Sequence, residues 1–330
     1  MRARSTLPSS MPRSTETSAH LPLRHRPQGD LAIAVVGHRR DGHARSLIKR
    51  LEKLGARASF VELSASIFST LHPSGLALPG FGAQLPDGVI VRAIAAGSFE
   101  AVTRRLGVLH ALREQGVLVW NDARAIERCV DKSMTTFLLA RDGLPTPETW
   151  AVESRAEALR VVRRETLRRP LVLKPLFGSQ GRGLKLVRSV RDLPEEASVA
   201  NVYYLQRFVG GAGPEHSDFR VLVSHGKIVA AMRRRAMHWI TNVKQGGRPE
   251  AAEIGESLAE LAIRSAAAVG ADFAGVDILV GSEGEPYVLE VNSMPAWRGL
   301  QSVSGNDIAA MVAKDFLLVL RERIRVRRSA

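Results

Sequence analysis

The stretch GVDILVGSEGEPYVLEVN, residues 275–292, decides the fold because it brings three oxygen-bearing side chains together. Two apolar runs flank a turn of glycine, serine, glutamate and proline, a pattern that predicts a β-hairpin. A turn centred between residues 283 and 284 pairs Asp277 with Glu290 across the two strands. Side chains alternate along a strand, so Asn292 shares the face of Glu290. The stretch therefore predicts two carboxylates and one amide on a single face of the hairpin.

Two like charges that face each other destabilise a sheet. A divalent cation bound between them would remove this repulsion, and Mg²⁺, which takes a few carboxylates plus substrate phosphates, is the natural candidate. The alternative is a solvated acidic hairpin with a slipped register. The spacing alone leaves both interpretations open.

The bulk composition is that of a globular protein. The 330 residues are 45% hydrophobic and 24% charged, and a chain of this length suits two or three domains. No apolar run is long enough for a membrane span, and the single cysteine, Cys129, excludes an internal disulfide. The net charge of +14 comes mainly from scattered arginine, without a nucleic-acid-binding motif. We expect a cytoplasmic protein that binds neither nucleic acid nor membrane and whose positive field suits an anionic substrate.

The order of predicted elements divides the chain. Residues 1–29 are rich in Ser, Pro, Arg and Thr and predict a disordered tail. Alternating strands and helices predict a parallel α/β domain at residues 30–122, which lacks the G-x-G-x-x-G motif of dinucleotide sites. One helix is expected over residues 125–141, and helices and antiparallel strands are expected in the rest of the chain.

A glycine-rich turn, GSQGRG at residues 178–183, follows a predicted strand that contains Lys174. Glycines let a backbone approach an anion closely, and successive N–H groups can bind phosphate. A lysine on one side and a divalent metal on the other is the combination that a triphosphate needs. An ordinary turn is the alternative.

Arginines follow on the next two predicted strands. Asp218 and Arg220 alternate on one strand, and residues 233–235 end the other with three arginines. These side chains form either a solvated basic edge or a site in which one or two of them stabilise charge on a transferring phosphoryl group.

Several stretches in a fixed order resemble the ATP-grasp superfamily, and within it the RimK-type α-L-glutamate ligases. The resemblance covers residues 85–305 well and residues 30–84 loosely. It implies an ATP-grasp fold of α/β and α+β class, with a Rossmann-like N-terminal domain, a flap subdomain at residues 123–203 and a metal and nucleotide subdomain at residues 204–330. The stretches that carry it are AIERCVDKSMTTFLLARDGLPTPET, PLVLKPLFGSQGRGLKLV, DFRVLV, AAMRRRA, TNVKQGG, AGVDILV and VLEVNSMPAWRG.

The resemblance also implies roles for single residues. Arg220 and Arg234 would stabilise an acyl phosphate or its transition state, and Gln206 to Phe208 would bind adenine mainly through the backbone. The implied Mg²⁺ ligands, with Mn²⁺ and two ions per site also compatible, are Asp277, Glu290 and Asn292. The implied ATP-binding residues are Lys132, Lys174, Gly178, Ser179, Gln180, Gly181, Gln206, Arg207, Phe208, Asp218, Thr241 and Asn242.

Two positions depart from the family pattern. Arg207 stands where the family often has glutamate, which a backbone contact to adenine tolerates. The loop before TNVKQGG is shortened to residues 237–240, and this loop would lie near the acceptor. His238 in that loop and Arg92, after the strand GVIV, are candidate substrate-binding residues. The stretch SMPAWRGLQ is similar to a subgroup linked to tetrahydromethanopterin or methanofuran one-carbon metabolism.

The implied activity is that of an ATP-dependent carboxylate–amine ligase. A carboxylate attacks the γ-phosphate of ATP, and the acyl phosphate is then attacked by an amine, expected to be that of L-glutamate. The expected acceptor is a small-molecule carboxylate such as a pterin or furan coenzyme, and a homo-oligomer is compatible with this function. The alternatives are a peptide or protein C-terminus as acceptor, and a non-catalytic ATP-binding module.

Overall fold

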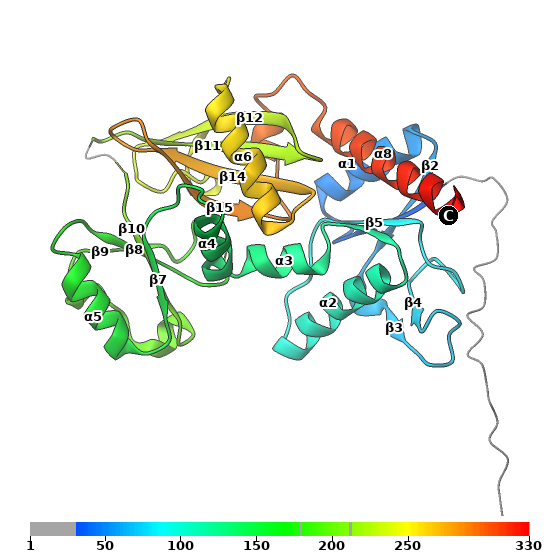
Figure 1. Ribbon diagram of the computed structural model, residues 1–330, viewed down its shortest axis with the longest axis horizontal. Coiled ribbons are helices and arrows are strands. Elements are labelled where there is room, and N and C mark those ends of the chain that lie inside the picture. The colour runs from blue at the N-terminus through cyan, green and yellow to red at the C-terminus, as the bar shows by residue number, and fades with distance from the viewer. Residues whose placement is uncertain (1–30, 179, 211–212, 330) are drawn as a thin grey trace, which may run out of the picture. The chain divides into compact units, whose positions relative to one another are not determined.

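The computed structural model describes residues 31–178, 180–210 and 213–329 (Figure 1). These residues belong to one compact unit. The tail predicted at residues 1–29 and the predicted phosphate-binding residue Ser179 lie outside the described residues. In the part of the chain that the structure describes, no helix is long and apolar enough to cross a membrane.

A four-stranded parallel sheet forms the N-terminal part, as the alternating strands and helices predicted. Its strand order is β2-β1-β5-β6, and β1 is buried almost throughout because it is a central strand with helices packed beside it. The long connection between β2 and β5 contains the two short strands β3 and β4. The elements are β1 (Leu31–Val36), α1 (Gly42–Lys53), β2 (Ala56–Val61), β3 (Ile67–Phe68), β4 (Leu76–Ala77), β5 (Gly88–Val91), α2 (Phe99–Glu114) and β6 (Leu118–Trp120).

Helix α8 (Ile308–Ser329) packs against this sheet, and Figure 1 shows it in red beside the blue α1. Phe316 meets Trp120 edge to face, with ring centroids 5.5 Å apart. Gly88 in β5 permits the close approach, since a Cβ atom there would lie 2.6 Å from the Phe316 ring. The core of the first sheet is therefore completed by the far end of the sequence.

Two short helices, α3 (Ala123–Val130) and α4 (Lys132–Arg141), replace the single helix expected over residues 125–141. Asp131 separates them because its carboxylate accepts hydrogen bonds from the backbone N–H groups of Ser133 and Met134, at 2.8 and 3.2 Å. Such N-capping starts a new helix. Lys132 consequently becomes the first residue of α4.

The second sheet has the order β7-β10-β8-β9 and carries α5 on one face. The boundary predicted between residues 203 and 204 falls within β10, which hydrogen-bonds to β7 and β8. The glycine-rich turn joins β8 to β9, as predicted. The elements are β7 (Thr149–Val152), α5 (Arg155–Glu165), β8 (Leu171–Lys174), β9 (Lys185–Val187) and β10 (Tyr203–Arg207).

The third sheet is five-stranded, with the order β13-β12-β11-β14-β15. Helix α6 covers one face and buries apolar residues such as Val221 and Val276 against it. The opposite face carries the charged residues that the sequence singled out. The elements are β11 (His216–Ser224), β12 (Lys227–Ala236), β13 (Arg248–Ala251), α6 (Glu256–Val269), β14 (Phe273–Val280), β15 (Pro286–Asn292) and the short α7 (Arg298–Gln301).

The β14–β15 hairpin has the predicted pairing at the site and a different one near its turn. Asp277 lies opposite Glu290, as expected, but Ile278 lies opposite Val288, so Leu289 is an extra residue in β15. Such a β-bulge reverses the alternation of side chains beyond it. Val288 and Val291 consequently both pack in the α6 core although they are three residues apart.

Candidate functional site

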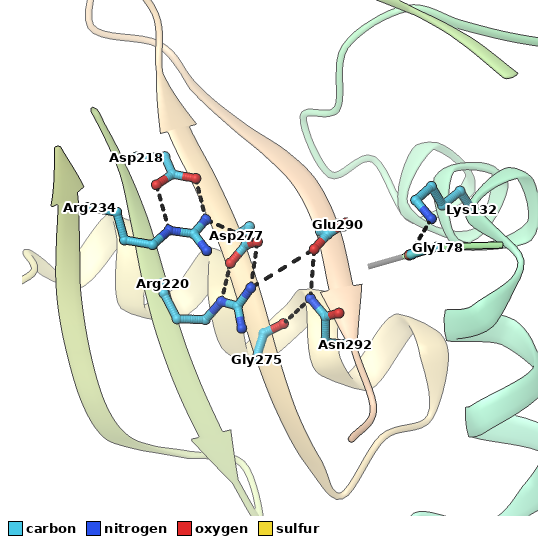
Figure 2. Close-up of polar contacts among 9 residues, drawn as sticks. All are labelled: Lys132, Gly178, Asp218, Arg220, Arg234, Gly275, Asp277, Glu290 and Asn292. Atoms are coloured by element: carbon cyan, nitrogen blue, oxygen red, sulfur yellow. Dashed lines mark hydrogen bonds and ion pairs between the residues drawn. The ribbon is translucent and has the colours of Figure 1, made fainter. Parts of the chain in front are cut away.

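Oppositely charged side chains face one another on the open side of the third sheet (Figure 2). Asp218 on β11 is directly opposite Arg234 on β12, and Arg220 on β11 is opposite Asp277 on β14. Arg234 donates to Asp218 through Nε at 2.8 Å, and its Nη2 lies 3.0 Å from Asp277 Oδ2. Arg220 donates from Nη2 to the same Asp277 oxygen at 2.7 Å. Two guanidinium groups thus bind two carboxylates in one chain of ion pairs.

This arrangement keeps the Asp277 carboxylate ionised. Asp277 is 2% exposed. Burial alone would raise the pKa of its carboxyl group, but the guanidinium groups of Arg220 and Arg234 outweigh burial and lower the pKa to about 2. Burial would likewise lower the pKa of Arg234, and its two carboxylate neighbours raise it instead. Asp277 and Arg234 are therefore both charged at neutral pH.

Glu290 and Asn292 complete this face, as Figure 2 shows. Asn292 Nδ2 donates to Glu290 Oε1 at 3.0 Å, and Arg220 Nη2 lies 3.9 Å from the same oxygen. The structure therefore brings the three predicted metal ligands together. It corrects the reasoning behind them, because arginines already offset the repulsion between Asp277 and Glu290. No group of three or more His, Cys, Asp or Glu residues that could hold a metal occurs in the described ranges.

Two lysines approach the acidic face from the second sheet and from α4. Lys174 is 9% exposed and donates from Nζ to Gln206 Oε1 at 2.5 Å. Lys132 donates to the backbone carbonyl groups of Leu176 and Gly178, at 3.2 and 2.9 Å. Burial lowers the pKa of both lysines, that of Lys174 to about 8, while the charge of Glu290 acts in the opposite direction on each. The negative charge of Glu290 thus acts on both ammonium groups.

The glycine-rich turn is closed against the loop that follows β12. Gly181 has φ +71°, and a Cβ atom there would lie 2.6 Å from Asn242 Oδ1 and 2.7 Å from Ile240. The pocket between these segments has a volume of about 100 Å³, below the 300–1,000 Å³ typical of ligand sites. A nucleotide would therefore require the turn to move away from Asn242.

Most of the predicted nucleotide residues line this pocket. Arg220 and Asn292 lie beside it on the charged face. Trp239, whose ring meets that of Phe208 edge to face with centroids 6.0 Å apart, also lines it and was missed because a lone aromatic residue carries no local signal. The lining residues that were predicted are Lys132, Lys174, Gly178, Gln180, Gly181, Gln206, Arg207, Phe208, Asp218, Arg234, Thr241, Asn242, Asp277 and Glu290.

Arg207 limits how the expected adenine contact can be made. Its side chain points away from Gln206 and binds Glu148 Oε2, at 3.0 and 2.8 Å, and the backbone oxygen of Glu165 at 2.9 Å. Its backbone N–H donates to the oxygen of Glu148, and that of Phe208 to the oxygen of Pro170. Both N–H groups are already used, so adenine would have to bind the carbonyl groups of this segment or a later N–H group.

The two candidate substrate residues lie outside the nucleotide pocket. Arg92 is 4% exposed, donates from Nη2 to the oxygen of Pro295 at 2.7 Å, and lies 4.4 Å from the centroid of the Trp297 ring. Its Nε and Nη1 have no hydrogen-bond partner among the described residues. His238 borders a separate cavity together with Glu215 and Arg235.

Comparison with known proteins agrees with this geometry. The family model described as the RimK-like ATP-grasp domain matches residues 129–316, which include both lysines and the whole charged face. The tetrahydromethanopterin:α-L-glutamate ligase of Methanococcus maripaludis is 36% identical over 215 residues, covering 63% of this chain and 72% of that protein. A probable α-L-glutamate ligase of Thioalkalivibrio sulfidiphilus is 34% identical over 250 residues, covering 74% of this chain and 78% of that protein.

Solved structures show the same fold. The ATP-grasp ligase PsnB, in complex with a minimal precursor, superposes with a TM-score of 0.69 at 23% identity, covering 89% of this chain and 99% of that one. The RimK domain protein of Sphaerobacter thermophilus gives a TM-score of 0.64 at 22% identity. The predicted fold class is confirmed. Because the family model spans more than half of the chain and its residues form the charged face, we conclude that this chain belongs to the RimK-like ATP-grasp family and is an ATP-grasp ligase.

Proposed function

We propose that this ligase joins L-glutamate to a carboxylate acceptor, with a pterin-type coenzyme as the first candidate. The observation that carries the proposal is the charged face, where Asp277, Glu290 and Asn292 lie together with Lys132 and Lys174 nearby. The sequence relatives named tetrahydromethanopterin:α-L-glutamate ligase support glutamate and a coenzyme acceptor. An amide-forming ligase needs no protein nucleophile, so positioning and electrostatics suffice.

The residues fit ATP with Mg²⁺. Carboxylate and amide oxygens are the ligands that Mg²⁺ takes. Glu290 is only partly buried, and the Asn292 amide uses its Nδ2 on Glu290 and Gly275, so its Oδ1 has no hydrogen-bond partner among the described residues. When bound, Mg²⁺ would neutralise charge on the β- and γ-phosphates. Mn²⁺ as a substitute for Mg²⁺ and a second ion at the same site are parts of the same proposal.

Lys132 and Lys174 would bind the phosphates. Lys132 already donates to the carbonyl group of Gly178 in the glycine-rich turn, so a phosphate at the turn would lie within reach of its ammonium group. Lys174 would exchange its uncharged partner Gln206 for a phosphate oxygen, which adds the attraction between opposite charges to the hydrogen bond. The two lysines thus orient the transferring phosphoryl group.

Arg220 is better placed than Arg234 to act on the reacting atoms. Both guanidinium groups use Nε and Nη2 on carboxylates, but Arg234 is 4% exposed, whereas the side chain of Arg220 is 11% exposed and lies beside Glu290. In the reaction, an acceptor carboxylate oxygen bonds to the γ-phosphorus, and the bond to the β–γ bridging oxygen breaks to release ADP. The amine nitrogen then bonds to the acyl carbon, loses a proton and displaces phosphate. Arg220 would stabilise the charge on the transferring group.

The acceptor site is the least defined part of the proposal. Arg92 supports a substrate carboxylate because its Nε and Nη1 have no partner in the described ranges. His238 and residues 237–240 would face an acceptor that reaches past the closed turn. A peptide carboxylate is the alternative. A cytoplasmic location, a homo-oligomer and the domain boundaries at residues 122 and 203 also stay predictions.

A screen of candidate acceptors by mass spectrometry, with ATP, Mg²⁺ and L-glutamate, tests the proposal. A product heavier than the acceptor by one glutamate minus one water, with matching ADP release, identifies the acceptor. The Glu290→Gln variant should form no ADP while it keeps the wild-type melting temperature. Glu283→Gln, in the exposed turn of the same hairpin, is the matched control and should keep full activity. Wild-type ADP formation by Glu290→Gln would refute the metal assignment. If none of the carboxylates that are screened gives a product, the proposed class of acceptor is refuted.

A further inference from the structure

A buried amide that the sequence did not single out joins the first sheet to the hairpin of the third. Asn121 directly follows β6 and is 1% exposed. Its Nδ2 donates to the backbone oxygens of Phe273 and Ser293, each at 2.5 Å, and its Oδ1 accepts from the N–H group of Phe273 at 3.0 Å. One side chain therefore binds the first residue of β14 and the residue that follows β15.

The chemistry of these partners fixes the orientation of the amide. Two carbonyl oxygens can only accept, so they require the NH₂ group, and the N–H of Phe273 requires the carbonyl oxygen. An exchange of the two ends would leave three buried groups without a partner, each at a cost in stability. No other uncharged side chain of the same shape offers this combination of two donors and an acceptor. An asparagine at this position therefore satisfies two backbone carbonyl groups and one backbone N–H group in a single orientation.

The hairpin needs such a contact because its turn sets a register one residue away from that of the site. Near the turn, Ile278 pairs with Val288, and a ladder continued from there would pair Asp277 with Leu289 and turn Glu290 toward the α6 core. A one-residue slip moves every side chain to the other face of a sheet. The bulge at Leu289 restores the pairing of Asp277 with Glu290, and Asn121 binds the two strands on the far side of that bulge.

We propose that Asn121 is a positioning residue that holds the open end of the hairpin in the register that keeps Glu290 and Asn292 on the face of Asp277. Ser293, which it binds, directly follows Asn292, and Phe273 precedes Asp277 by four residues. Arg92, which follows β5 in the first sheet, makes a similar contact to this end of the hairpin because it donates to the backbone oxygen of Pro295. This inference rests on the proposed function only for its metal readout, because the register itself can be measured without a nucleotide.

The first experiment measures ADP binding by calorimetry with and without Mg²⁺. Asn121→Asp keeps the shape and the acceptor but loses both donors, and Asn121→Ala loses all three bonds. Both variants should bind ADP without Mg²⁺ about as wild type does, and the gain in affinity on adding Mg²⁺ should fall about tenfold or more, the usual effect of losing a group that orients metal ligands. Ser224→Ala, which removes a buried hydrogen bond to Asp315 on α8, is the control for general loss of stability.

An equal loss of Mg²⁺ coupling in Ser224→Ala at a matched melting temperature would overturn the proposal, as would wild-type coupling in both Asn121 variants. The second experiment is hydrogen exchange in the absence of nucleotide. The Asn121 variants should exchange faster in the strand segments beyond the bulge, residues 273–277 and 290–293, than wild type, and residues 278–288 should be unchanged. Unchanged exchange at the open end refutes the positioning role. If the wild-type protein binds no ADP, the proposed function is refuted instead. Hydrogen exchange without nucleotide then decides whether Asn121 has the positioning role.

Discussion

Replacement of Lys174 by methionine should make the protein more stable and weaken its nucleotide binding. The Lys174 ammonium is buried against Gln206, and burial lowers its pKa from 10.5 to about 8. A shift of this size corresponds to about 3 kcal/mol of unfavourable free energy for the charged form in the folded state. Loss of the hydrogen bond from the charged ammonium to Gln206 costs about 2 kcal/mol. The expected net gain in unfolding free energy is about 1 kcal/mol at pH 7.

The gain should depend on pH with a defined sign. The folded pKa of Lys174 lies below that of the unfolded chain, so the unfolded state binds more protons between pH 8 and pH 10.5. Wild-type stability therefore rises with pH across this window relative to the variant. The advantage of Lys174→Met should be complete below pH 8 and absent above pH 10.5.

Urea unfolding at pH 7 and pH 10.5 and ADP titration by calorimetry measure these effects together. The affinity for ADP should fall by about tenfold to a hundredfold, the value of a hydrogen bond to a charged group. Lys185→Met, which removes an exposed lysine on the neighbouring strand β9, is the control and should change neither quantity. A variant that is less stable than wild type at pH 7 would refute the burial argument, and unchanged ADP affinity would refute the phosphate-binding role.

Two further predictions concern charged groups away from the reacting atoms. Arg207→Met should lower the unfolding free energy by about 1.5–3 kcal/mol, because it removes one of the two arginine partners of the buried Glu165 and leaves Arg164 as the other, while calorimetry should show unchanged ADP affinity in the folded protein. Burial, then the charge of Asp122, raises the pKa of Asp272 to about 6, so wild-type stability should fall as pH rises from about 4 to 6. Asp272→Asn should abolish that fall, worth about 3 kcal/mol, and identical urea midpoints of the two proteins at every pH would contradict it.

Local patterns predicted the elements better than their junctions. The pairing of Asp277 with Glu290 followed from two apolar runs and a turn, yet the bulge at Leu289 has no signal in its own residues because it arises from packing against α6. The split between α3 and α4 could have been found, since an aspartate before Lys132 and Ser133 is a recognisable N-cap. No such local sign indicates where α8 packs, because the strands that it contacts lie far away in the chain.

The site residues divide in the same way. Those in short motifs, such as Lys174 and the glycine-rich turn, lie where the motif indicated. The alternation that turns Gln206 toward Lys174 puts the side chain of Arg207 on the opposite face of the strand, toward Glu148 and Glu165, so the direction of this side chain could have been derived from the strand alone. Asn121 could not, because both of its partners are more than 150 residues away in sequence and a single asparagine after a strand has many uses.

The packing of α8 on the first sheet bears on the order of events during translation. Strand β6 ends at residue 120 and α8 begins at residue 308. While the ribosome adds the residues between them, the apolar side of the sheet around Trp120 lacks the part of its cover that α8 supplies beside α1, although N-terminal domains generally fold first during synthesis. The nascent chain therefore carries an exposed apolar surface until Phe316 has left the exit tunnel, and over that interval it is a natural client for a chaperone.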